Sequence, residues 1–147
     1  MYFLSAVVGF FLMTSFSSGQ MILEKSVTYN FTISMPDPSN HLIHVELSLS
    51  GAIKNSLNFR MPVWMPGYYQ IMNYPDQVSG FRVKDSRGKD LFCIRQGKNT
   101  WKVASGREKA IDIEYDVKAD KRFVANSWLD TTHCYMIPAG TFMYCDG

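Results

Sequence analysis

The side chains most able to do chemistry gather in the segment Asp130-Thr131-Thr132-His133. A carboxylate and an imidazole three residues apart in a loop can orient one another, as supporting groups do around many catalytic and metal sites. Aspartate and threonine side chains also cap turns by bonding to nearby backbone N–H groups. The segment therefore allows two interpretations, a small hydrolase that uses Asp130 and His133 or a structural turn. Trp128 and Tyr135 flank it, and no nucleophile-elbow motif accompanies it.

The other two histidines do not form a metal-ligand pair. His41 and His44 are three residues apart, and on a strand this spacing directs their side chains to opposite faces. The sequence contains no His-Glu-x-x-His motif, which supplies two zinc ligands and a general base in metallopeptidases. We therefore predict no catalytic residue, no metal ligand and no cofactor in this chain.

The three cysteines, Cys93, Cys134 and Cys145, leave at least one thiol without a partner in the chain. None of them belongs to a C-x-x-C pair. Cys134 and Cys145 would face each other if the chain ended in a hairpin. A disulfide needs Cα atoms within about 7 Å, and the sequence does not fix that distance, so the disulfide state stays open.

The segment Met61–Tyr69 interrupts the strands around it with two prolines, a glycine and three large aromatic rings. Proline fixes φ and lacks an N–H group, so this backbone cannot lie inside a sheet. Pro66-Gly67 predicts a tight turn in which Gly67 takes a positive φ. The segment is either a corner that closes a β core or a surface for recognition.

Alternation of apolar and polar residues with a period of two dominates the rest of the chain and predicts short strands. Three further segments near the end also look extended: Phe123–Trp128, Tyr135–Ile137, and Thr141–Cys145, which would pair with the second around Pro138-Ala139-Gly140. We predict an all-β fold, an antiparallel sandwich or curved sheet of eight or nine short strands. The clearest predicted strands are Val27–Met35, Ile43–Ser50, Leu57–Val63, Phe81–Val83, Leu91–Arg95, Thr100–Ala104 and Ile111–Ala119.

The first 19 residues have the character of a signal peptide. Met1–Met13 is almost wholly apolar and too short to span a membrane, and small residues precede a predicted cleavage after Gly19. We expect an exported protein, periplasmic or extracellular, with one β domain over residues 20–147. The formal net charge of +2 argues against nucleic acid as a partner, and we expect no membrane contact after cleavage.

Several segments in order resemble the N-terminal domain of the glycyl aminopeptidase family, the M61 zinc metallopeptidases that carry a thermolysin-like catalytic domain and a PDZ domain. The similarity extends from Val27 to Gly147 and includes Val78–Phe81 and Asn99–Val103. The principal segments are Val27–Pro38, His41–Gly51, Met61-Pro62-Val63-Trp64-Met65-Pro66-Gly67-Tyr68-Tyr69-Gln70-Ile71 and Leu129-Asp130-Thr131-Thr132-His133-Cys134-Tyr135.

This resemblance implies a non-catalytic β domain that packs against a zinc catalytic domain. In the family, zinc is held by a His-Glu-x-x-His helix and a later glutamate in a domain that follows this one, so the chain is expected to be a truncated part of a zinc aminopeptidase. The implied partners are that catalytic domain or its peptide substrate. Six residues match family motif positions and are expected at the domain interface or the cleft wall: Trp64, Pro66, Gly67, Tyr68, Asp130 and His133.

The alternative is a stand-alone secreted β-sandwich module that binds a peptide or a glycan. That interpretation requires Trp64, Tyr68 and Tyr69 to be exposed around a groove. The resemblance instead predicts an exposed apolar patch where the catalytic domain would dock.

Overall fold

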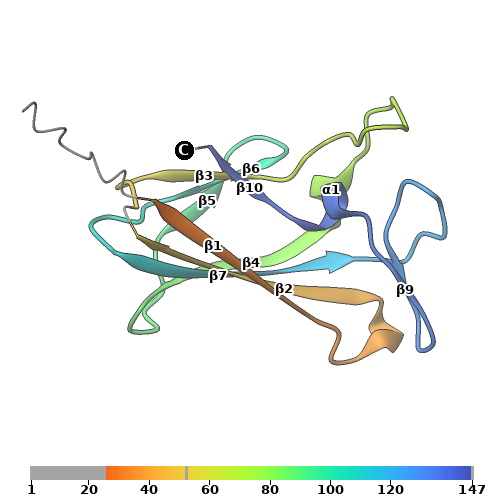
Figure 1. Ribbon diagram of the computed structural model, residues 1–147, viewed down its shortest axis with the longest axis horizontal. Coiled ribbons are helices and arrows are strands. Elements are labelled where there is room, and N and C mark those ends of the chain that lie inside the picture. The colour runs from red at the N-terminus through yellow and green to blue at the C-terminus, as the bar shows by residue number, and fades with distance from the viewer. Residues whose placement is uncertain (1–25, 52, 147) are drawn as a thin grey trace, which may run out of the picture.

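The structure is a computed structural model that describes residues 26–51 and 53–146. The predicted signal segment, Met1–Gly19, lies outside these residues. The described part is an antiparallel β-sandwich with ten strands, so the all-β prediction is confirmed and the number of strands is slightly higher than expected. Two four-stranded sheets form its layers, and a two-stranded ribbon lies at one end (Figure 1).

The first sheet has the order β1-β2-β7-β4, and every neighbouring pair is antiparallel. Its strands alternate apolar and polar residues, and only one face of β2 and β7 is buried, which is why the period-two pattern located them correctly. A bulge between Ser79 and Arg82 interrupts the β4–β7 register, with Gly80 at φ 64°. The strands are β1 (Val27–Ser34), β2 (Leu42–Gly51), β7 (Ala110–Lys118) and β4 (Val78–Asp85).

The second sheet has the order β10-β3-β6-β5. Three short helical turns and the ribbon of β8 and β9 fill the connections. The sheet strands are β10 (Tyr144–Asp146), β3 (Leu57–Arg60), β6 (Thr100–Val103) and β5 (Cys93–Arg95). The connecting elements are η1 (Pro38–Asn40), η2 (Tyr74–Gln77), β8 (Trp128–Leu129), β9 (Cys134–Tyr135) and α1 (Pro138–Thr141).

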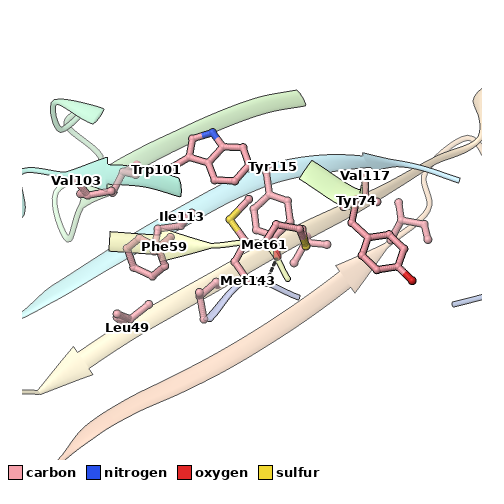
Figure 2. Close-up of a cluster of buried hydrophobic side chains, with 14 of the residues drawn as sticks. Leu49, Phe59, Met61, Tyr74, Trp101, Val103, Ile113, Tyr115, Val117 and Met143 are labelled. Atoms are coloured by element: carbon pink, nitrogen blue, oxygen red, sulfur yellow. Dashed lines mark hydrogen bonds between the residues drawn. The ribbon is translucent and has the colours of Figure 1, made fainter. Parts of the chain in front are cut away.

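The core fills the space between the two sheets (Figure 2). Burial of each large apolar side chain contributes roughly 1.5–3 kcal/mol, and this is the main source of the fold's stability. The Tyr115 hydroxyl is used within the core: it donates to the Thr141 carbonyl at 2.9 Å and accepts from the Met143 N–H at 3.2 Å. This burial raises the pKa of Tyr115 to about 12. The labelled members are Leu49, Phe59, Met61, Tyr74, Trp101, Val103, Ile113, Tyr115, Val117 and Met143.

The prediction of a terminal hairpin is wrong. Pro138 begins a helical turn, for which its fixed φ is suited, and the Thr141 hydroxyl donates to the Ile137 carbonyl at 3.0 Å. The chain then passes to the other sheet, where β10 pairs with β3. Cys134 and Cys145 consequently lie in different sheets, and all three cysteines are free thiols.

The extended prediction for Phe123–Trp128 is also wrong over most of its length. Residues 123–126 form bends and turns, residue 127 has no regular structure, and only Trp128 enters a strand. The buried Tyr74 hydroxyl donates to the Ala125 carbonyl at 2.7 Å, which fixes this compact path. β3 ends at Arg60, earlier than predicted, and β4 is longer than the predicted Phe81–Val83.

Candidate functional site

One end of the sandwich carries both motifs singled out from the sequence. Residues 61–73, between β3 and η2, and residues 120–136, which include β8 and β9, lie at this end (Figure 1). The rings of Tyr68 and Phe123 meet edge to face, with centroids 5.3 Å apart. We call the surface formed by residues 61–73 and 120–136 the end face.

The loop of residues 61–73 is pinned at its base and turns sharply at its tip. Its two arms are joined by a hydrogen bond from the Met72 N–H to the Val63 carbonyl, at 2.6 Å. At the tip, the Tyr68 N–H approaches the Met65 carbonyl at 3.5 Å, and Gly67 has φ 92°. Proline followed by a glycine with positive φ is the arrangement of a type II turn, so the predicted Pro66-Gly67 turn is confirmed.

On both sides of this turn, the loop exposes large apolar side chains. Tyr69 is 87% exposed and adopts a left-handed conformation, φ 51°, which is uncommon for a bulky residue and carries a conformational cost. Trp64 and Ile71 are exposed as well. The backbone therefore holds these side chains outward, away from the core that anchors the loop.

The segment around Asp130 is a capped turn. One carboxylate oxygen of Asp130 accepts from the backbone N–H groups of Thr132 and His133, at 2.8 and 2.9 Å, and from the Thr132 hydroxyl at 2.7 Å. These bonds hold the pKa of Asp130 well below its usual range. The His133 ring contacts the Thr132 hydroxyl through Nδ1 at 2.8 Å. The carboxylate thus orients the backbone of His133, and the capping interpretation accounts for its contacts.

The second oxygen of Asp130 engages Arg122, a residue that the sequence did not single out. The Arg122 Nη2 lies 2.7 Å from the Asp130 Oδ2. The same guanidinium covers the ring of Trp128 at 4.7 Å from its centroid, a cation–π contact. The Trp128 and His133 rings are 6.3 Å apart. Arg122 therefore links the capped turn to the aromatic side chains beside it.

Buried contacts behind the end face hold the two segments together. Besides the Tyr74 bond to the Ala125 carbonyl, the Gln77 amide reaches the Asn126 side chain at 3.4 Å. A Cβ added at Gly140 would lie 2.9 Å from the Tyr74 ring, so α1 packs directly on it. Burial, together with the neighbouring Tyr135 and Tyr68, raises the pKa of Tyr74. The end face rests on a packed base.

Open hollows lie on and beside the end face, and two of them adjoin the predicted site residues. One, of about 410 Å³, is lined by Arg122, Phe123, Val124, Trp128 and Tyr135. The second, of about 390 Å³, lies along the proline-rich arm of the loop, where Trp64 and Pro66 meet residues of α1 and β10. We call the first the Trp128 hollow and the second the Trp64 hollow, whose lining is Pro62, Val63, Trp64, Pro66, Asn99, Ala139 and Tyr144.

The structure brings together only part of the predicted set of site residues. Tyr68, Asp130 and His133 surround the Trp128 hollow through their contacts with Phe123, Arg122 and Trp128. Trp64 lines the other hollow, and Pro66 and Gly67 form the loop tip. Sequence reasoning missed Phe123 and Val124 because the segment Phe123–Trp128 was predicted to be extended, and it gave Arg122 no role.

The histidines and acidic residues elsewhere do not gather into a metal site. Nδ1 of His41 bonds to the Leu129 carbonyl, and Nδ1 of His44 lies 2.7 Å from the Asp116 carboxylate. Across residues 26–51 and 53–146, no group of three His, Cys, Asp or Glu side chains could hold a metal ion. In the same part of the chain, no helix is long and apolar enough to span a membrane.

Fold and site together define a β-sandwich domain with several exposed aromatic side chains at one end, among them Trp64, Tyr69, Phe123 and Tyr135. The family model of the Peptidase M61 N-terminal domain matches residues 30–147, and the chain belongs to this family. The resemblance inferred from the sequence motifs is thereby confirmed.

A solved structure has the same fold. It is the crystal structure of an aminopeptidase N family protein from Idiomarina loihiensis, with a TM-score of 0.75 and 22% sequence identity. The alignment covers 82% of this chain and 20% of that chain. The present chain thus corresponds to about a fifth of the longer protein. No curated protein sequence matches the chain.

Proposed function

We propose that this chain acts as the non-catalytic N-terminal domain of a glycyl aminopeptidase-type zinc metallopeptidase. In this proposal, the end face packs against the zinc catalytic domain and forms part of the wall of the substrate cleft. The family match supports the type of domain. The length of the structural neighbour, of which this fold is a fifth, supports a larger protein around it.

The exposed apolar surface of the end face carries this proposal. Large apolar side chains in water are stabilised by burial at roughly 25 cal/mol per Å², so a contiguous group of them favours a partner. Six of the exposed large hydrophobic side chains among the described residues belong to the end face: Trp64, Tyr69, Ile71, Phe123, Val124 and Tyr135.

The proposal assigns the zinc chemistry to the partner domain. A catalytic zinc site needs three protein ligands, and the described residues of this chain do not fit such a site because their histidines are separately engaged. In this proposal the domain contributes to the shape of the substrate cleft and takes no part in the chemical step. It would exclude water from one side of the cleft and position the peptide.

A binding experiment tests the docking surface. The purified chain is mixed with a separately produced His-Glu-x-x-His catalytic domain of the same family and from the same genome, and the complex is detected by size-exclusion chromatography with light scattering. The double variant Trp64→Ser/Tyr69→Ser should weaken association by at least about tenfold, since central aromatic residues commonly contribute 2 kcal/mol or more each.

Phe92→Ser is the matched control because Phe92 is 70% exposed but lies at the far end of β5 from the end face. It should leave association unchanged. Loss of binding in the control alone, or no complex with the wild-type chain, would remove the docking proposal.

A second function is favoured by one observation, the open Trp128 hollow with three aromatic walls. It suits a stand-alone secreted module for a peptide or a glycan. This alternative predicts that the chain binds such a ligand by itself and forms no complex with a catalytic domain.

We also propose that the chain is exported, with cleavage after Gly19. Support comes from the apolar, uncharged run at the start of the sequence. Expression in a bacterial host followed by intact-mass analysis of the periplasmic fraction tests this. A mature chain beginning at Gln20 is expected, and uncut chain in the cytoplasm would contradict it.

A further inference from the structure

We propose that the Trp128 hollow binds a peptide at an aromatic side chain that lies next to a carboxylate. The inference deepens the proposed function, because it rests on that function in placing the end face beside a peptide cleft. The proposal specifies the chemistry of the ligand that the hollow binds. Binding of this ligand can be tested separately from association with the catalytic domain.

The walls of the hollow have the chemistry of an aromatic side-chain site. Phe123, Trp128 and Tyr135 supply rings, and Val124, which is 65% exposed, supplies an aliphatic edge. The volume of about 410 Å³ lies within the range of small-molecule sites. Aromatic rings pair favourably in offset or edge-to-face arrangements, so a ligand ring gains contacts here that a small aliphatic side chain would not.

The hollow is held open by contacts that do not involve a ligand. The Tyr135 hydroxyl donates to the Val124 carbonyl at 3.0 Å, which ties β9 to the opposite wall. The Asn126 N–H donates to the Phe123 carbonyl at 2.9 Å, and Tyr68 packs on the ring of Phe123 from outside. Walls that are already ordered lose less conformational freedom on binding.

The rim of the hollow has more hydrogen-bond donors than acceptors. Asp130 is saturated: one oxygen accepts three bonds within the turn, and the other receives the Arg122 Nη2. Arginine has five N–H donors, and among the described residues the Asp130 carboxylate is the only hydrogen-bond acceptor of the Arg122 side chain. The group that complements this surplus is an acceptor, and a carboxylate forms the strongest such bond with a guanidinium.

The same geometry disfavours a cationic ligand. The face of Trp128 is already covered by the Arg122 guanidinium at 4.7 Å. A ligand ammonium would meet a like charge there, and it would find the Asp130 carboxylate occupied. Rings alone would suit a cation, so the placement of Arg122 decides the sign of the preferred ligand.

The test uses three probes with the full chain and isothermal titration calorimetry: N-acetylphenylalanine, its amide, and N-acetylalanine. We expect the aromatic acid to bind at least about fivefold more tightly than the other two, since an exposed charge-assisted bond adds of the order of 1 kcal/mol. Equal affinity for acid and amide, or no binding of the aromatic acid up to its solubility limit, would overturn the proposal.

Three variants locate the effect. Arg122→Gln should abolish the preference for acid over amide while retaining the ring preference, and Val124→Asp should weaken all aromatic probes. Lys102→Gln, at an exposed lysine of β6, is the matched control for lost charge and should change nothing. Because Arg122→Gln also removes the contact with Asp130, Arg122→Lys is measured beside it and should restore the acid preference in part. If Arg122→Gln and Lys102→Gln behave alike, the proposal fails.

The outcome is distinguishable from that of the docking experiment. A chain that forms the complex but does not discriminate among the probes loses this inference alone. A chain that discriminates but forms no complex retains the peptide site and loses the docking proposal.

Discussion

The end face and the outer face of the first sheet are both exposed and rich in functional groups, yet they differ in how those groups are used. On the outer face of the sheet, carboxylates pair with neighbours across the strands: Asp116 pairs with His44 at 2.7 Å, and Glu114 lies 3.0 Å from Arg82 and 3.1 Å from Lys84. On the end face, large rings project into water and Arg122 retains unused donors.

A high density of charged side chains is therefore a poor guide to the functional surface of this domain. Groups that satisfy one another across strands gain little from a partner and would lose their existing contacts on binding it. Groups held outward by a pinned loop and a capped turn gain contacts when a partner arrives. The end face is therefore the surface expected to bind a partner, and changes at the two surfaces should have different effects.

The largest effect should come from weakening the base beneath the end face. Tyr115→Phe removes a buried hydroxyl that bonds to the Thr141 carbonyl and the Met143 N–H, on either side of the passage from α1 to β10. Leaving these groups unsatisfied should lower the free energy of unfolding by about 2–3 kcal/mol. Urea unfolding measures the change. The exposed Tyr144→Phe serves as control and should cost less than about 0.5 kcal/mol.

A smaller effect is expected at the tip of the loop. Gly67 has φ 92°, and nothing lies within 4 Å of a Cβ built there, so Gly67→Ala introduces backbone strain without a clash. The cost should be about 1–2 kcal/mol if the turn is retained. Thermal and urea unfolding measure it. An unchanged midpoint together with weakened docking would show that the loop relaxes into another conformation.

The ion pairs on the outer face of the sheet should contribute less still to the free energy of unfolding. A double-mutant cycle over Lys84→Met and Glu114→Gln should give a coupling of about 0.2–1 kcal/mol, which high salt reduces, because both side chains are partly solvated. Neither change should affect docking or probe binding. A docking defect in these variants would contradict the contrast between the two surfaces.

The last effect is present at neutral pH and is lost only in acid. The folded pKa of Asp130 is depressed below its unfolded value of about 3.9, so its stabilisation is fully present above that pH and is lost as the pH falls. Arg122 faces the carboxylate from outside the turn. The stability difference between wild type and Asp130→Asn should therefore shrink below about pH 4. Parallel stability curves from pH 7 to pH 2 would exclude this role.

The sequence predicted the sheets better than the connections between them. Alternation located β2 and β7 because each buries one face over most of its length, a local property of the pattern. The prediction of a terminal hairpin was wrong because β10 pairs with β3, which is distant in the sequence. The residues next to β10 carry no local pattern that indicates this pairing. The compact path of residues 123–127 depends on the distant Tyr74 hydroxyl in the same way.

For the candidate site, the sequence predicted the components and missed the link between them. Pro66, Gly67 and Asp130 were recognised because turn chemistry is local. Arg122 became visible only when the structure placed its guanidinium between Trp128 and Asp130. The flanking Trp128 was the one sequence signal that pointed toward it.

The pairing of β10 with β3 has a consequence for synthesis on the ribosome. β3 leaves the exit tunnel early, but its edge beside Phe59 and Arg60 is filled only when Tyr144–Asp146 emerges. At 5–20 residues per second, the nascent chain carries an unpaired strand for several seconds, and open strand edges recruit other chains. Within the described residues, β10 is therefore the strand that covers this edge of β3 during translation.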